Sequence, residues 1–279
     1  MSLQGIIAFG MTAVIISGEI DLSIGSTVAL TGVIIGLITN YLNSTFGIDP
    51  TFGVIFGIII SIIVATIIGL FHGYLKTKFK LPTFIITLAT LNIIYGIAAV
   101  ISKGFPVIGL PEWYNFIGSG DILGIPFAAI LLIIVFIFMF ILMEHTKFGR
   151  AIYAVGGNPE SARLSGIKVK KVQIICLVIV QVCSAISGVI MSSQVMSGSF
   201  NFGKGWEMTA ISSVIIGGAS LSGGIGKTWG TLVGLIFLGI LINAMTLLNI
   251  NDYVQYIVRG GLILIAVLLN IVQNNKKGG

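Results

Sequence analysis

Residues 51–75 read T-F-G-V-I-F-G-I-I-I-S-I-I-V-A-T-I-I-G-L-F-H-G-Y-L and contain no Asp, Glu, Lys or Arg. A bilayer core of about 30 Å needs about 20 apolar residues in a helix, so this run is long enough to cross a membrane. Six further runs of this kind lie at 24–42, 82–102, 125–143, 172–192, 226–248 and 253–272, and two marginal ones lie at 3–17 and 207–222. The runs do not alternate apolar with polar residues, which excludes a β-barrel. We therefore predict an all-α polytopic transmembrane helical bundle with about nine crossings, some broken or re-entrant.

The composition agrees with this fold class. Of the 279 residues, 56% are hydrophobic and 9% are charged, and the mean hydropathy is +1.10. Because a soluble domain carries roughly 25% charged residues, a soluble enzyme is excluded. The net charge of +6 does not indicate nucleic-acid binding, because the basic residues lie beside apolar runs. Cys176 and Cys183 are seven residues apart, about 10 Å along a helix, and have neither disulfide nor metal-site spacing.

The basic residues predict the orientation of the chain. They gather at 76–80, within the 144–171 connection and at 276–277, whereas the loops 43–50 and 103–124 hold three acids and one lysine. Cytoplasmic loops carry an excess of Lys and Arg, so all three clusters are expected in the cytoplasm. Nine crossings then place Met1 outside. We therefore expect one further N-terminal helix that this chain lacks.

The first unusual segment is S-G-E-I-D-L-S-I-G-S, residues 17–26, which places two carboxylates between apolar runs. An Asp at mid-span costs about 2.5–3.5 kcal/mol on insertion scales, so a nearby cation is expected, with Arg259 and Lys227 as candidates. One interpretation is a charged turn between two helices, and the other is a broken helix that lines a transport path. Glu207 is interpreted either in this way or as a first-turn acid beside an interfacial Trp. The candidate path or hinge residues are Glu19, Asp21, Ser23, Gly25, Asn92, Glu207, Gly217 and Gly218.

The second unusual segment is G-G-N-P-E-S-A-R-L-S-G, residues 156–166, within the connection 144–171. Asn158 is a good N-cap, Pro159 suits the first helical position and Glu160 suits the positive end of the helix dipole. Gly166 is placed to adopt the left-handed conformation after the helix. The segment predicts either a simple orienting loop or a short helix that docks a cytoplasmic protein.

The third segment, S-L-S-G-G-I-G-K-T at 220–228, ends like a phosphate-binding loop. The first glycine of that motif is replaced by Leu221, so we interpret the segment as a glycine-rich break between membrane segments. L-S-G-G-I-G at 221–226 is weakly similar to L-S-I-G-S-T at 22–27, and each precedes an apolar run. This similarity is consistent with a repeated broken-helix unit.

Four stretches carry a family resemblance. They are G-M-T-A-V-I-I-S-G-E-I-D-L-S-I-G-S (10–26), A-V-G-G-N-P-E-S-A-R-L-S-G-I-K-V-K-K-V (154–172), V-I-I-G-G-A-S-L-S-G-G-I-G (214–226) and Y-V-Q-Y-I-V-R-G-G-L-I-L-I-A-V-L-L (253–269). In this order they resemble the permease subunits of bacterial ATP-binding-cassette sugar importers of the cytoplasmic membrane. Residues 1–279 would then form a single permease domain. His72 departs from the family, which often has Asn there.

The resemblance implies a permease that is not an enzyme and binds no cofactor. Its partners would be an ATPase that hydrolyses ATP inside, a sugar-binding protein outside, a second permease copy and membrane lipid. The implied ATPase-coupling residues are Gly157, Asn158, Pro159, Glu160, Ala162, Arg163, Leu164 and Gly166. The sugar stays open among ribose, xylose, galactose and autoinducer-2.

Two other classes of function are alternatives to a permease subunit. An ion-coupled secondary transporter would use the intramembrane acids Glu19, Asp21 and Glu207, but it needs no docking helix. An intramembrane enzyme would need a paired constellation of reactive side chains, and the sequence has none with suitable spacing.

Overall fold

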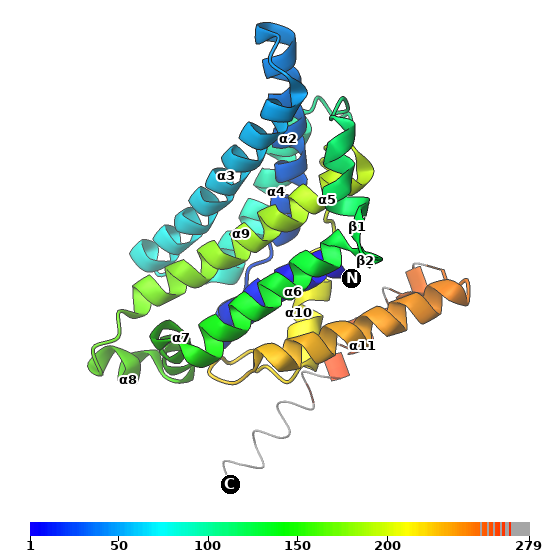
Figure 1. Ribbon diagram of the computed structural model, residues 1–279. Coiled ribbons are helices and arrows are strands. Elements are labelled where there is room, and N and C mark those ends of the chain that lie inside the picture. The colour runs from blue at the N-terminus through cyan, green and yellow to red at the C-terminus, as the bar shows by residue number, and fades with distance from the viewer. Residues whose placement is uncertain (252, 256, 259, 263, 266–267, 269–279) are drawn as a thin grey trace.

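Long helices dominate the part of the chain that the computed structural model describes, which is residues 1–268 without 252, 256, 259, 263, 266 and 267 (Figure 1). In chain order the elements are α1 (Ser2–Ile16), α2 (Ile24–Phe46), α3 (Pro50–Phe79), α4 (Thr83–Ile101), the 3-10 turn η1 (Glu112–Tyr114), α5 (Asn115–Ser119), β1 (Asp121–Ile122), β2 (Ile125–Pro126), α6 (Phe127–Phe140), the π-helical turn η2 (Ile141–His145), α7 (Lys147–Gly157), α8 (Pro159–Leu164), α9 (Val169–Val195), α10 (Trp206–Ile216) and α11 (Thr228–Leu247). The strands β1 and β2 form a small antiparallel hairpin.

Six helices among the described residues are long and apolar enough to span a membrane. They are α2, α3, α4, α6 with η2, α9 and α11. The two marginal runs of the sequence form α1 and α10, which are apolar but shorter. The predicted ninth run, 253–272, includes residues outside the described part of the chain. The all-α, multi-pass architecture is confirmed.

Helix α1 is the centre of the packing. Every residue from Gly5 to Ile16 is buried, and α1 packs against α6, α9, α10 and α11. A helix that is apolar all round needs such a buried position. Because α1 is enclosed, the segment that follows it is also held inside the protein rather than at an open surface.

Small residues allow the helices to approach closely. A Cβ on Gly69 of α3 would lie 2.6 Å from the Cα of Val178 on α9, and a Cβ on Gly57 would lie 2.8 Å from the Cα of Ile35 on α2. In lipid no hydrophobic force holds helices together, so close van der Waals packing of their backbones does so instead. In this way α3 is fixed against both α2 and α9.

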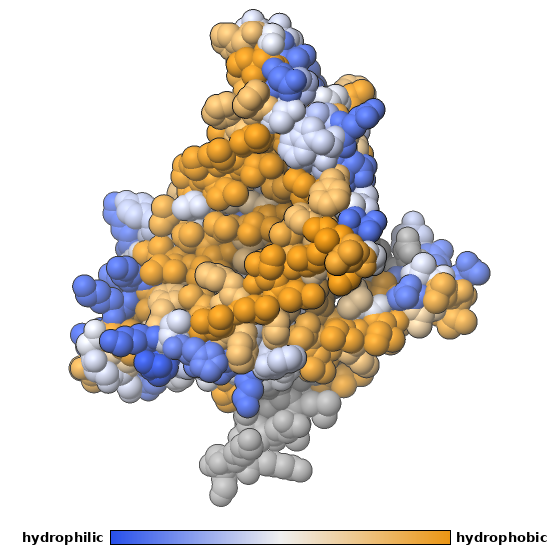
Figure 2. All heavy atoms as spheres, viewed as in Figure 1, coloured by the Kyte–Doolittle hydropathy of each residue, from blue (hydrophilic) through white to orange (hydrophobic). Residues whose placement is uncertain are grey.

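One end of the bundle is basic and polar. The C-terminal turn of α3 carries Lys76 and Lys78 at this end. Helices α7 and α8 lie there too (Figure 1). The end of α7 contacts the last residues of α1, because Gly156 packs against Ile16. Figure 2, in the same view as Figure 1, shows a broad apolar belt across the middle of the molecule. Hydrophilic side chains lie at the α7–α8 end and at the opposite end, near the α2–α3 turn. The predicted third basic cluster, 276–277, lies outside the described residues.

Candidate functional site

The acidic segment after α1 is buried, and its two carboxylates form two polar layers. In the first layer, Glu19 forms an ion pair with Lys76 of α3 and accepts a hydrogen bond from Thr83 at the start of α4. The Gln173 Nε2 of α9 donates to Glu19 Oε1 at 2.9 Å. Only 6% of Glu19 is exposed. The cation beside Glu19 is thus Lys76; Lys227 is exposed, and Arg259 lies outside the described residues.

The second layer surrounds Asp21, which is fully buried. Its Oδ1 accepts hydrogen bonds from the Ser23 backbone N at 2.8 Å and from Ser23 Oγ at 2.7 Å. Its Oδ2 accepts from Gln181 Nε2 at 2.8 Å and lies 3.6 Å from Nδ1 of His72. The other ring nitrogen of His72 is hydrogen-bonded to Thr90 of α4 at 2.8 Å.

The two layers connect three helices, α3, α4 and α9, to the α1–α2 break. His72 and Lys76 are four residues apart and share one face of α3, while Gln173 and Gln181 extend from α9. Buried charges need such partners, because a lone carboxylate in a medium of low dielectric constant is costly. The charged segment is therefore a buried turn whose carboxylates are satisfied by the protein.

A second break follows α10, and its backbone conformation is similar to that of the first break. Gly18 has φ +82° and donates its N–H to the carbonyl of Ile15, while Gly218 has φ +90° and donates to that of Ile215. The residue after each glycine donates to a carbonyl five residues earlier, as in a Schellman cap. The flanking sequences are V-I-I-S-G at 14–18 and V-I-I-G-G at 214–218, a repeat that lies just before the similar stretches 22–27 and 221–226.

The loop after the second break packs against the first break and the end of α7. The Gly224 N–H donates to the Ile16 carbonyl at 2.8 Å, and the Oη of Tyr153 on α7 donates to the Gly226 carbonyl at 3.1 Å. Burial, together with the charge of Glu144, raises the pKa of Tyr153 to about 12, so its hydroxyl stays protonated near neutral pH. Gly217 instead packs against the backbone of Gly230 in α11.

The structure brings Gly25 and Glu207 together at the start of α10. A Cβ on Gly25 would lie 2.9 Å from Glu207 Oε2 and 3.1 Å from the Tyr95 hydroxyl. Oε2 of Glu207 has no hydrogen-bond partner among the described residues. Lys204 Nζ lies 5.7 Å from the centre of the Tyr95 ring. The cluster lies at the N-terminal end of α10, where Glu207 is half-buried and Lys204 is exposed.

Asn92 and Gly218 are not part of that cluster. The Asn92 amide donates to the Leu88 carbonyl of its own helix at 3.2 Å, and its side chain is exposed. Gly218 has open space where a Cβ would be. Ser23, by contrast, belongs to the Asp21 layer, where Gln181 Nε2 also donates to its hydroxyl at 2.8 Å.

The predicted short helix is present as α8, with the predicted caps. Asn158 Oδ1 accepts hydrogen bonds from the backbone N–H groups of Glu160 and Ser161, both at 3.0 Å, and Pro159 occupies the first turn. Gly166 has φ +85°, the left-handed conformation expected beyond the C-terminus. Asn158 also ends α7, so one residue joins the two helices.

Helix α8 presents a charged and apolar surface at the basic end of the bundle. Arg163 donates to Glu160 through Nη2 at 2.6 Å and Nε at 3.1 Å. These hydrogen bonds and the guanidinium charge lower the pKa of Glu160, so the pair stays charged at neutral pH. Ala162 is buried, whereas Leu164 is 75% exposed. The exposed surface of α8 therefore carries the Glu160–Arg163 ion pair and Leu164.

Known transport proteins are similar to this chain over almost its whole length. The family described as branched-chain amino acid transport system / permease component matches residues 1–267. The ribose import permease protein RbsC of Bacillus subtilis (strain 168) is 43% identical over 273 residues, covering 97% of this chain and 82% of that protein. RbsC of Haemophilus influenzae is 36% identical, covering 99% of this chain and 84% of that protein. The L-arabinose transport system permease protein AraH of Escherichia coli (strain K12) is 38% identical, covering 99% and 82%.

The comparison with solved structures finds no match. The family match covers almost the whole chain, and the described residues include six helices able to cross a membrane. The chain therefore belongs to the family of transport-system permease components, as a multi-pass protein of the bacterial cytoplasmic membrane.

Proposed function

We propose that residues 1–279 form one permease domain of an ATP-binding-cassette importer, which moves a monosaccharide across the membrane by alternating access. The sugar would be a pentose such as ribose or arabinose, in keeping with the names of the relatives described above. ATP would be hydrolysed by a separate subunit, so this chain would bind no cofactor and catalyse no reaction. A sugar-binding protein outside and a second permease copy complete the proposed assembly.

The observation that carries this proposal is the capped, exposed helix α8 and its connection to both breaks. Its surface, with Arg163 and Leu164, is the proposed contact for the ATPase. Asn158 links α8 directly to α7, and the last turn of α7 packs on the end of α1 and on the 217–227 loop. A rigid displacement of α8 would therefore act on the two points at which the membrane helices are interrupted.

The polar residues at the breaks would have different tasks. The layers around Glu19 and Asp21 would brace the α1–α2 break, because all their charged oxygens already have protein partners. The cluster of Gly25, Tyr95 and Glu207 has an unsatisfied buried oxygen, so it would contribute to the path itself. Asn92, Gly217 and Gly218 stay as proposed path or hinge positions.

Reconstitution with and without an ATPase subunit tests the proposal. ATP-driven uptake of D-ribose or L-arabinose, lost when the ATPase is omitted, is expected. Uptake driven by an ion gradient without that subunit would refute the proposal and favour the secondary transporter that uses Glu19, Asp21 and Glu207.

Arg163→Glu tests the contact itself. Both residues are good helix formers, so α8 is kept while the charge at position 163 is reversed. The variant should insert normally but lose co-purification with the ATPase. Lys103→Glu reverses an exposed charge in the 103–124 loop, away from α8, and serves as the matched control for ATPase binding. Normal ATPase binding by Arg163→Glu would contradict a role for α8 in docking.

A further inference from the structure

Five basic side chains gather where the end of α3 meets the start of α9. The two helices pack side by side (Figure 1), with Gly69 and Gly73 of α3 against Val178 and Ile174 of α9. This antiparallel register places the C-terminal turn of α3 beside the first turn of α9. The exposed lysines of these two turns form what we call the α3–α9 patch: Lys78, Lys80, Lys168, Lys170 and Lys171.

The charges of this patch are not balanced within the described part of the chain. Lys76 is paired with Glu19, and Arg163 with Glu160, but none of the five patch lysines forms an ion pair with a described residue. Residues 74–80 and 166–173 contain no Asp or Glu. Five like charges on two adjacent helix ends repel one another, so an anion bound among them would relieve the repulsion.

The exposed face of α3 shows that lipid reaches the patch. Exposed apolar side chains follow one another along this helix from Phe52 to Tyr74. At 1.5 Å per residue this stripe is about 33 Å long, close to the thickness of a bilayer core. Lys78 lies one turn beyond Tyr74 and donates a hydrogen bond to its hydroxyl. The Lys78 ammonium also lies 5.0 Å from the centre of the Tyr74 ring and 5.6 Å from that of Phe79. Lysines beside exposed aromatic rings are typical of the headgroup layer.

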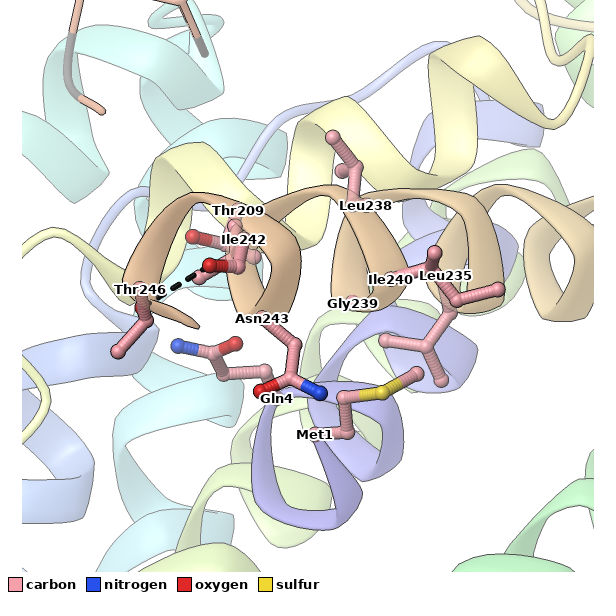
Figure 3. A pocket seen from close by; sticks show the side chains of 10 residues that line it. All are labelled: Met1, Gln4, Thr209, Leu235, Leu238, Gly239, Ile240, Ile242, Asn243 and Thr246. Carbon is pink, nitrogen blue, oxygen red and sulfur yellow. Dashed lines mark hydrogen bonds between the residues drawn. The ribbon is translucent and has the colours of Figure 1, made fainter. Parts of the chain in front are cut away.

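A partner for this surface must therefore be anionic and must approach from the bilayer. The phosphate of an anionic lipid would accept hydrogen bonds from the lysines, while its acyl chains would lie along the apolar stripe of α3. A soluble phosphate would leave that stripe unused. The cavity between α1, α10 and α11 (Figure 3) has no Lys or Arg in its lining, so it lacks the cations that such a headgroup needs. We infer that the α3–α9 patch binds the headgroup of an anionic phospholipid, such as phosphatidylglycerol, in the cytoplasmic leaflet.

A lipid bound here would also stabilise the layer around Glu19. Lys76 and Gln173, which both contact Glu19, are each two residues from a patch lysine, Lys78 and Lys171 respectively. The lipid would hold these two helix ends together. Because a ligand that binds only the folded protein stabilises it, phosphatidylglycerol should raise the midpoint of thermal unfolding more than phosphatidylcholine does.

Native mass spectrometry of the purified protein in detergent tests the inference by measuring the Kd of the first lipid bound. The unmodified chain should bind phosphatidylglycerol more tightly than phosphatidylcholine. Lys78→Gln/Lys171→Gln should weaken phosphatidylglycerol binding about 25-fold, because each basic side chain near an anionic headgroup contributes about a factor of five. Lys78→Arg/Lys171→Arg keeps both charges and should bind like the unmodified chain.

The matched control is Lys147→Gln/Arg150→Gln, which removes the same charge from exposed positions on α7. Its Kd for phosphatidylglycerol should be unchanged. Equal weakening by both pairs would show only a general attraction to the basic end and would overturn the patch as a site. Binding of inorganic phosphate as tight as that of phosphatidylglycerol would also overturn it, because the bilayer would then contribute nothing.

A third result would assign the patch to another partner. If Lys78→Gln/Lys171→Gln lost ATPase binding but kept the Kd for phosphatidylglycerol, the patch would be a protein contact and the inference would be wrong. The lipid measurements need neither ATPase nor sugar. Absence of ATP-driven uptake would therefore refute the proposed function and leave the lipid site to be decided by its own Kd values.

Discussion

Replacing Gly156 by Ala should weaken the packing through which α7 and α8 contact the two breaks in the membrane helices. Gly156 is buried in the last turn of α7, and a Cβ there would overlap the Ile16 carbonyl oxygen and lie 2.5 Å from the Gly224 N. Both are backbone atoms, so no side-chain rotation relieves the overlap. The neighbouring Gly157 has nothing within 4 Å of an added Cβ. Adjacent glycines thus supply a test variant and its control.

The expected changes in the free energy of unfolding have opposite signs for Gly156→Ala and Gly157→Ala. Ala is better than Gly in a helix by up to about 1 kcal/mol, so Gly157→Ala should be neutral or slightly stabilising. At Gly156 the same gain is outweighed by overpacking, which costs about 1–3 kcal/mol. Separation of the backbones would also weaken the 2.8 Å hydrogen bond from Gly224 to Ile16, a loss of about 1 kcal/mol. Gly156→Ala should therefore be less stable than Gly157→Ala by roughly 2–4 kcal/mol.

Two assays read out the effect. Thermal unfolding of the purified protein should show a lower midpoint for Gly156→Ala than for Gly157→Ala. In proteoliposomes, Gly156→Ala should still bind the ATPase, because α8 keeps its caps, but should transport less sugar for each ATP hydrolysed. Equal midpoints and an unchanged ratio of sugar to ATP would refute the close packing of α7 on the breaks and its role in coupling.

Three further substitutions follow from the geometry. Asp21→Asn places an NH₂ group where one oxygen now accepts hydrogen bonds, and should cost about 1–3 kcal/mol by thermal unfolding, whereas Asp49→Asn, at an exposed N-cap, should be silent; equal midpoints would contradict the buried layer. Asn158→Ala should destabilise α8 by about 1 kcal/mol and weaken ATPase binding, with Asn158→Asp restoring it; undiminished binding would contradict the cap. Gly166→Val, at φ +85°, should cost at least about 1–2 kcal/mol and also weaken binding; unchanged hydrogen exchange across α8 would argue against this strain.

The features of the chain that the sequence predicts best are local ones. Asn158 and Pro159 are read correctly as a helix start, because a cap is decided by residues two or three positions apart. The long membrane helices follow from apolar length alone. The short helices α1 and α10 were harder to predict, because their lengths reflect where the chain breaks inside the protein rather than the thickness of a bilayer.

Partners across helices were not predictable from spacing. Lys76 lies 57 positions after Glu19, and Gln181 lies 160 positions after Asp21, so only the packing of α3 and α9 brings them together. One signal was available: His72 and Lys76 are four residues apart, and a His and a Lys on one face of an apolar helix need partners. Cys176 and Cys183 remain simple core residues of the same α9 face.

The two breaks share a backbone but differ in how they are held. At the position of Glu19 in the first break, the second has Ala219, which is buried and apolar. The first break is thus tied to three other helices by ion pairs and hydrogen bonds. The second is held by the backbone of Gly223 and Gly224, both with positive φ, against Gly156, by Gly217 against Gly230 and by the hydrogen bond from Tyr153 to Gly226. Because the described residues of the 217–227 loop form no ion pair, whereas Glu19 pairs with Lys76 in the first break, we expect a displacement of α8 to move this loop first.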